Sequence, residues 1–475
     1  MGEAVYGQAV IEERQLLKSL RWYDGFVIAL ANPGFLIGAL GGSIGVLGGW
    51  GALTLWGISA AMGVLQNWIY SEQAAMFPDK PGGISLYAHE GWRKYLTLVG
   101  PVATFGYWFA WSSVLASFGL LIGGIAQAQW FEGETWTFDT GPVTAGFPHV
   151  AAAVLIVAVW LFNIFGVRPA LFVGYATGAL MMIPLGVFIV LPYLTGDWES
   201  SNMTWSVPDW QTAIAWLWIM GWSAYGVEAC ATFAPEYKDT VRDTTLALRS
   251  AAVFSLAVYT LLPLGIGGVM TQEEIGANPY AFYVPAFDQI VGGASNLMVV
   301  LLIASLLLSM NTATADGSRA LYGIARDGMT IKQLDHLNRF HVPARAMTID
   351  MLINLALVFF VGNILAIYVV GNVGYIMAHV FALSAFVLLR RDRPNWPRPI
   401  QLSPLWVPIA IALTAINLFL VVIGVWYTEK IGYGGTKEVL YGLGVLAISI
   451  LLYVFRRAVQ DKQPIRLRED TPAAP

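Results

Sequence analysis

The chain has 475 residues, of which 57% are hydrophobic and only 12% are charged. Soluble domains carry about 25% charged residues, so this composition excludes an ordinary soluble fold and indicates an all-α integral membrane protein. The net charge of −4 says little, because charge in a membrane protein is read loop by loop. The single cysteine, Cys230, excludes an intrachain disulfide.

Apolar runs predict twelve transmembrane helices joined by short loops, and the chain length suits about a dozen spans of ~20 residues. Residues 1–21 are polar and do not resemble a cleaved signal peptide, so we expect them to form an N-terminal tail. The predicted spans cover residues 24–47, 50–74, 96–128, 148–166, 169–194, 210–234, 244–270, 296–325, 347–363, 365–390, 404–428 and 438–457.

Lysine and arginine residues predict the orientation of these spans. All of them except Lys430 and Lys437 fall on one side when the loops are assigned alternately to the two faces of the membrane. Positive charge is retained on the cytoplasmic side. We therefore expect a multi-pass protein of the cell membrane with both termini in the cytoplasm, residues 458–475 forming the C-terminal tail.

Two of the predicted spans contain helix-breaking residues in their middle. The first carries Asn32-Pro33-Gly34, and the sixth carries Gly-Trp-Ser-Ala-Tyr-Gly at residues 221–226. Paired interrupted helices in corresponding halves of a chain indicate the substrate site of a transporter. Unwound backbone at bilayer depth requires protein or a polar cavity around it, so we expect the two breaks to face each other.

Glu228 follows the second break inside an apolar run. An acidic residue within the membrane is costly and is a functional candidate by default. Two readings stay open: Glu228 binds a proton or acts in gating, or it accepts hydrogen bonds from amides that a break has freed.

Aromatic residues near the breaks suit a site for an ammonium group, since ring faces attract cations. Trp222 lies inside the second break and favours a binding or gating role, while plain packing explains Tyr107 and Trp108 better. The other candidates are Trp111 and Tyr225.

Further polar residues occur in the eighth and tenth spans. Ser305 and Ser309 could coordinate Na⁺, although hydroxyls in such helices more often bond the preceding turn. His379 could relay protons or simply pack. The eighth span also contains Asn311, Thr312 and Asp316.

The sequence contains no glycine-rich phosphate loop ending in Lys-Ser or Lys-Thr, which excludes a nucleotide-driven pump. Five scattered histidines and one cysteine provide no zinc cluster. We therefore expect no enzyme activity, no metal, no cofactor and no nucleic-acid partner.

Three segments, together with a fourth and shorter one, resemble the amino acid–polyamine–organocation transporter family. Residues 77–83, Phe-Pro-Asp-Lys-Pro-Gly-Gly, with Tyr87, resemble the family's loop after the second helix. Residues 222–228, Trp-Ser-Ala-Tyr-Gly-Val-Glu, followed by Glu236 and Lys238, resemble its sixth helix. Residues 318–328, Ser-Arg-Ala-Leu-Tyr-Gly-Ile-Ala-Arg-Asp-Gly, resemble its eighth-helix signature, and residues 163–168 resemble its link between helices four and five.

This resemblance implies two inverted five-helix repeats, at 22–194 and 210–390, and two peripheral helices within 404–457. Substrate would lie between broken helices one and six, and that bundle would move against a scaffold. By resemblance, Trp222, Ala224 and Tyr225 would contact substrate, Glu228 would support gating or coupling, and Ala110 and Trp111 would line the wall formed by helix three.

Two positions depart from the family pattern. The first break usually reads Gly-Ser/Ala-Gly, whose amides hold a carboxylate, but here Pro33 donates no amide and Phe35 adds bulk after Gly34. The lysine that some members carry in helix five is replaced by Met181.

Together these features predict a secondary active transporter for an amino acid or a small organic amine, coupled to H⁺ or Na⁺ or working by exchange, with H⁺ favoured. An amine without a carboxylate, held in an aromatic cage, is one alternative. A channel or a sensor on the same scaffold is an alternative from another class.

Overall fold

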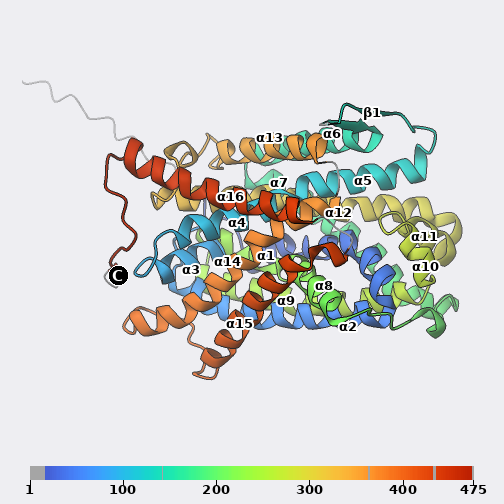
Figure 1. The fold of residues 1–475 in the computed structure, drawn as a ribbon, viewed down its shortest axis with the longest axis horizontal. Helices are drawn as coiled ribbons and strands as arrows, with labels where there is room; N and C mark the ends of the chain where they lie inside the picture. Colours follow the sequence, from blue (N-terminus) through green and yellow to red (C-terminus); the bar gives the residue numbers. More distant parts are fainter. Residues whose placement is uncertain (1–15, 142, 362–363, 432–434, 473–475) are drawn as a thin grey trace, which may run out of the picture.

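The computed structural model describes residues 16–141, 143–361, 364–431 and 435–472. Residues 1–15 of the predicted N-terminal tail and residues 473–475 of the predicted C-terminal tail lie outside the described residues. The described part of the chain is built from α-helices, with one short antiparallel pair of strands in which Phe138 pairs with Ala145. Figure 1 shows most helices running along the long axis of the molecule.

The helices follow the predicted apolar runs closely. In the first half of the chain the elements are α1 (Trp22–Ala29), α2 (Asn32–Met76), α3 (Gly83–Trp92), α4 (Val99–Ser112), α5 (Val114–Trp130), β1 (Thr137–Asp139), β2 (Thr144–Gly146), α6 (Phe147–Ile164), α7 (Val167–Thr195) and η1 (Ser200–Asn202). In the second half they are α8 (Trp210–Ala224), η2 (Gly226–Glu236), α9 (Thr240–Gly267), α10 (Gln272–Ala277), α11 (Tyr283–Val291), η3 (Gly292–Ala294), α12 (Ser295–Arg326), η4 (Lys332–Leu334), α13 (Ala344–Phe360), α14 (Ile364–Asp392), α15 (Trp406–Trp426), η5 (Thr428–Ile431), α16 (Thr436–Phe455) and η6 (Arg456–Gln460).

Nine helical stretches in the described part of the chain are long and apolar enough to cross a membrane. One of them, Trp22–Met76, turns at Gly48, between the spans predicted at 24–47 and 50–74. Gly48 has a φ of 76°, and a Cβ there would lie 2.5 Å from the carbonyl oxygen of Thr204, so the turn requires glycine. The predicted sixth and ninth spans fall on α8, which has 15 residues, and α13, which has 17 residues. The chain is therefore a multi-pass, all-α membrane protein.

Two groups of helices pack around the centre of the protein. The first, which we call the bundle, consists of α1, α2, α8, η2 and α9. The second, which we call the scaffold, consists of α4, α5, α6, α12 and α13. α7 packs against both α9 and α12, and α14 packs against α3, α4, α15 and α16. The broken helices belong to the bundle, so the site lies where the bundle meets the scaffold.

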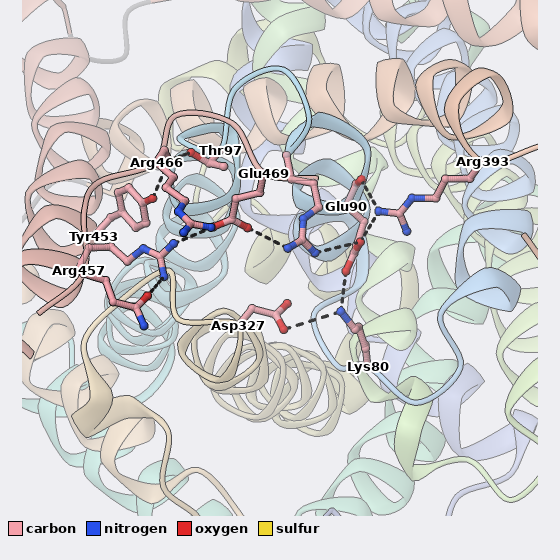
Figure 2. Close-up of polar contacts among 11 residues, drawn as sticks. Lys80, Glu90, Thr97, Asp327, Arg393, Tyr453, Arg457, Arg466 and Glu469 are labelled. Atoms are coloured by element: carbon pink, nitrogen blue, oxygen red, sulfur yellow. Dashed lines mark hydrogen bonds and ion pairs between the residues drawn. The ribbon is translucent and has the colours of Figure 1, made fainter. Parts of the chain in front are cut away.

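One end of the molecule, which we call the charged end, carries α3 and the C-terminus, while α10, α11 and β1 lie at the opposite end (Figure 1). At the charged end Glu90 is buried and accepts hydrogen bonds from Lys80 at 2.5 Å and Arg393 at 2.6 Å (Figure 2). Burial by itself raises the pKa of Glu90, but the positive charges of Lys80 and Arg393 and the hydrogen bond from Lys80 outweigh it, so that pKa is lowered to about 2. Glu90 is therefore ionised and ties α3 to the loop before α15.

The C-terminal tail lies across the same end of the protein. Glu469 accepts from Arg93 at 2.8 Å and from Arg457 at 2.9 Å (Figure 2). The tail backbone takes part as well, since the carbonyl oxygen of Arg466 accepts hydrogen bonds from both Thr97 and Tyr453. The tail thus joins the end of α16 to the turn between α3 and α4.

Candidate functional site

The first break lies at Leu30 and Ala31, between α1 and α2. The sequence placed it at Asn32-Pro33-Gly34, but these residues form the first turn of α2. Proline suits that position, because the first residues of a helix need no amide partner within the helix. The break therefore lies at the two residues directly before the Asn-Pro-Gly segment that predicted it.

Side-chain hydroxyls also reach the backbone carbonyls at the first break. Ser309 on α12 donates to the carbonyl oxygen of Ala31 at 2.7 Å, and Thr312 donates to that of Ile28 at 3.3 Å. Ser305, the other residue considered for Na⁺, instead donates to Leu302 in its own helix. The hydroxyls that meet the break are therefore those of Ser309 and Thr312.

The second break lies at Tyr225. α8 remains helical through residues 221–224, although the sequence placed the break across 221–226, and η2 continues as a 3₁₀-helix from Gly226 to Glu236. A Cβ at Gly63 of α2 would lie 2.8 Å from the carbonyl oxygen of Ala224, so α2 packs closely against this break. A long 3₁₀ stretch is uncommon and often marks a hinge or a functional segment.

The two breaks meet each other, as the sequence predicts. A Cβ at Gly226 would lie 2.7 Å from Oδ1 of Asn32, so only glycine permits this approach. Tyr259 on α9 lies between the breaks, with its hydroxyl 2.9 Å from the carbonyl oxygen of Asn32 and 3.0 Å from that of Ser223. The side chain of Asn32 also donates to Ser255 of α9. One helix thus holds both breaks together.

Aromatic rings fill the centre beside the breaks. The ring of Phe35 lies 5.1 Å from that of Trp111 and 5.3 Å from that of Trp222. Trp222 packs in turn on Tyr368, with ring centroids 4.4 Å apart. Between Phe35, Trp111, Trp222 and Tyr375 the described side chains leave no space for a water molecule. The centre is therefore closed, and a ligand could enter only after these rings move.

Glu228 borders these rings through Tyr375 and is fully buried. Tyr375 on α14 donates to Glu228 Oε1 at 2.6 Å, and His379 Nε2 lies 4.0 Å from the same oxygen. The other nitrogen of His379 lies 2.7 Å from the hydroxyl of Tyr70. Glu228 therefore lies in a buried cluster of titratable side chains contributed by η2, α14 and α2.

The structure brings most of the predicted site residues to this centre. Gly34 faces α12, where a Cβ would lie 2.2 Å from Ser309 Oγ, and the ring of Tyr225 lies 5.1 Å from that of His379. Tyr107 and Trp108 on α4, which packing alone could explain, each donate to a buried aspartate: Tyr107 to Asp316 and Trp108 to Asp350.

Sequence reasoning missed Tyr259 and Tyr375, which contact the breaks and Glu228, and it missed the buried acid Asp350. Asp350 is fully buried on α13, and its backbone carbonyl accepts a hydrogen bond from Asn354. The signal was present in the sequence, because an acid inside a predicted span is a functional candidate on the same grounds as Glu228. Its position near the start of that span made it resemble a loop residue.

A buried ion pair joins the bundle to the scaffold on the α12 side of η2. Arg319 donates to the two oxygens of Glu236 at 2.5 Å and 3.2 Å, and both side chains are at most 2% exposed. The guanidinium also lies over the ring of Phe233 at 4.3 Å. This two-point contact holds η2 against α12.

Comparison with known proteins agrees with this arrangement. The family model described as "Amino acid permease" matches residues 22–452. An uncharacterized amino acid permease of Bacillus subtilis, YvbW, is 24% identical over 229 residues, which make up 47% of this chain and 51% of that relative. An arginine/ornithine antiporter of Pseudomonas aeruginosa is 26% identical over 311 residues, covering 62% of this chain and 60% of the relative.

A gamma-aminobutyric acid permease of Bacillus subtilis is 21% identical over 483 aligned residues, covering 94% of this chain and 95% of the relative. The first relatives are matched over about half of their length. The family model, by contrast, spans nearly the whole described chain, including both breaks and Glu228. The chain therefore belongs to the amino acid permease family, within the amino acid–polyamine–organocation superfamily.

Proposed function

We propose that the protein is a secondary active transporter that moves an amino acid or a related small organic amine across the cell membrane by alternating access. The observation that carries this proposal is the meeting of the two helix breaks, where Gly226 abuts Asn32 and Tyr259 reaches both. In transporters, discontinuous helices form the substrate site at the interface of the two repeats.

The substrate would bind where the rings of Phe35, Trp111 and Trp222 now close the centre. Ring faces attract ammonium groups, each contact contributing about 0.5–2 kcal/mol. Pro33 donates no amide, so a carboxylate would have fewer backbone partners than in a break built from glycines. Relatives named for arginine, ornithine and gamma-aminobutyric acid make these compounds the first to test.

Protons are the coupling ion that the site supports best. Glu228, Tyr375 and His379 form a continuous buried group of proton donors and acceptors beside the aromatic cluster. A carboxylate inside the membrane is costly unless it is neutralised, which links proton binding to closure of the site. Sodium is the alternative. It would be coordinated by the carbonyl oxygens of the first break and by the hydroxyl oxygens of Ser309 and Thr312, whose hydrogens would then point away from those carbonyls.

The proposed arrangement in the membrane has twelve spans, formed by two inverted five-helix repeats at 22–194 and 210–390 and two peripheral helices, α15 and α16. Both termini lie in the cytoplasm. The concentration of arginine and lysine around α3, α14 and the C-terminal tail supports this orientation, because positive charge favours the cytoplasmic face.

A thermal-shift panel of the purified protein tests the substrate class. Each amino acid is paired with the amine formed by its decarboxylation, starting with arginine and ornithine. A ligand that binds only the folded protein stabilises it by about 2.7 kcal/mol at 100 times Kd. Stabilisation by amino acids alone indicates that the site holds a carboxylate, and stabilisation by amines alone indicates an ammonium cage.

Transport is then measured in proteoliposomes, with preloaded substrate so that an exchanger is also detected. Uptake that follows an imposed pH gradient supports proton coupling, and uptake that requires Na⁺ supports the sodium alternative. Glu228→Gln is expected to slow transport more than it weakens binding. If neither gradient nor counterflow drives any amino acid or amine, the proposed function is wrong.

A further inference from the structure

Asp316 is a second buried carboxylate beside the site, and the coupling scheme above does not use it. It lies on α12 and is fully buried. Its Oδ2 accepts from the hydroxyl of Tyr107 on α4 at 2.8 Å, and its Oδ1 contacts the hydroxyl of Thr232 on η2. Asp316, on α12 of the scaffold, therefore contacts both α4 of the scaffold and η2 of the bundle.

The hydrogen bonds of Thr232 bear on the charge of Asp316. The Thr232 hydroxyl lies 2.8 Å from the carbonyl oxygen of Ala229, to which it donates in the manner of helix hydroxyls. A hydroxyl has one hydrogen, so this donation leaves none for Asp316. One hydrogen cannot serve both acceptors, whereas a proton on Asp316 Oδ1 gives each contact its own hydrogen: Thr232 donates to Ala229, and Asp316 donates to Thr232.

The neighbouring charges lead to the same conclusion. Arg319 follows Asp316 on α12, but its guanidinium donates to Glu236 and to the carbonyl oxygen of Ala315. The cation nearest in sequence is thus already paired with another carboxylate. A buried carboxylate without a cationic partner is so costly that it takes up a proton instead.

Groups from five elements face this region. They are Glu228, Cys230 and Glu236 on η2, Arg319 on α12, Tyr107 on α4, Tyr375 on α14 and Asp350 on α13. The rings of Tyr107 and Tyr375 stack with centroids 6.1 Å apart, so the hydroxyls that serve Asp316 and Glu228 come from adjoining rings. Apart from the paired Arg319, none of these groups carries a fixed positive charge.

We propose that Asp316 is a second proton-binding residue of the transporter, which must hold a proton for η2 to close against α12 and α4. The proton joins the carboxylate from water on the cytoplasmic side as η2 closes and returns to that water as η2 opens. This role rests on the proposed function, but it concerns closure and can be measured without any substrate.

The first test is infrared spectroscopy of the purified full-length protein, which detects the carbonyl band of protonated carboxyl groups. Asp316→Asn is expected to remove one such band at neutral pH. Asp350→Asn is measured beside it, because Asp350 is also fully buried and accepts a hydrogen bond from Trp108, so the band of Asp316 can be told apart from any band of Asp350. An unchanged set of bands in Asp316→Asn overturns the proposal.

The second test separates proton binding from its effect on closure. Cys230 is the only cysteine of the chain and is buried on η2, so its reaction with a maleimide reports opening of that element. Relative to the unfolded protein at each pH, labelling of the parent is expected to rise severalfold between about pH 5 and pH 8. Asp316→Asn should abolish this rise, while Asp350→Asn should keep it.

A parent-like rise in Asp316→Asn overturns the proposal. If that variant does not fold, Thr232→Val replaces it, since this change removes the hydroxyl that accepts the Asp316 proton and leaves the carboxyl in place. Labelling is then expected to increase already at the acidic end of the range, and parent-like labelling there counts against the role of Asp316 in closure. Neither result depends on which compound is transported, so both can still be interpreted if the transport assay fails.

Discussion

The buried ion pair between Arg319 and Glu236 offers the sharpest test of how η2 is held closed. Glu236→Gln keeps the shape of the side chain but leaves the guanidinium without its charge partner. Removing one member of a buried pair costs about 3–5 kcal/mol, because the remaining charge stays out of water. The two hydrogen bonds and the near-complete burial of both side chains place this pair in that class.

The cost falls on the closed arrangement, since opening of η2 returns the guanidinium to water. About 3 kcal/mol corresponds to roughly a 100-fold change in the equilibrium between closed and open forms. Maleimide labelling of Cys230 follows the open population when opening is fast compared with the reaction. We therefore expect Glu236→Gln to raise the labelling rate by about two orders of magnitude.

Glu273→Gln provides the matched control, because Glu273 is exposed on α10 at the opposite end of the protein. A second comparison combines Glu236→Leu with Arg319→Met, since apolar replacement of a buried pair is often neutral or stabilising. The double variant should label nearly as slowly as the parent. The reasoning is refuted if Glu236→Gln is labelled at a rate within about twofold of the rates of the parent and of Glu273→Gln. The ion pair would then not be the contact that holds η2 closed.

Three further predictions concern stability. The first concerns Glu90, whose burial is outweighed by positive charge so that its pKa is lowered to about 2. The ionised carboxylate therefore stabilises the folded protein above pH ~4.3, and this stabilisation is lost as the pH falls toward 2. Glu90→Gln should lower the melting temperature at pH ~7, by an amount that shrinks in acid. Tyr259→Phe should destabilise the protein by about 1–3 kcal/mol in denaturant titrations, because break carbonyls lose their donor, and an unchanged midpoint would contradict this. Gly106→Ala should reduce the folded yield sharply, since its Cβ would lie 2.4 Å from the backbone oxygen of Gly374, whereas Gly124→Ala, with open space around it, should not.

The sequence predicted the helices well because hydrophobic length dominates in a membrane. Apolar runs near 20 residues have few alternatives to a helix, and the predicted limits agree with the observed ones to within a few residues. The exact position of each break was harder to predict. Asn32-Pro33-Gly34 is compatible with a helix start, so the chain bends just before it, at Leu30 and Ala31.

The site was predicted in part for a related reason. Glu228 stood out because it follows a visible break, whereas the roles of Asp316 and Asp350 depend on partners from distant helices. Tyr107 reaches Asp316 across 209 positions, and Trp108 reaches Asp350 across 242. Which of several polar residues on one helix meets a partner is decided by the rotation of helices against each other, and that cannot be read from a single apolar run.

The contacts of the C-terminal tail with the turn between α3 and α4 have a consequence for how the protein is made. Glu469 neutralises Arg93 from 376 positions further along the chain. During synthesis, the two spans that flank the loop of Arg93 are therefore inserted while Arg93 still lacks this partner. Unpaired positive charge is what retains a loop in the cytosol during insertion. In the orientation proposed above, the late arrival of Glu469 lets the same arginine first direct topology and then, once topology is set, fasten the finished fold.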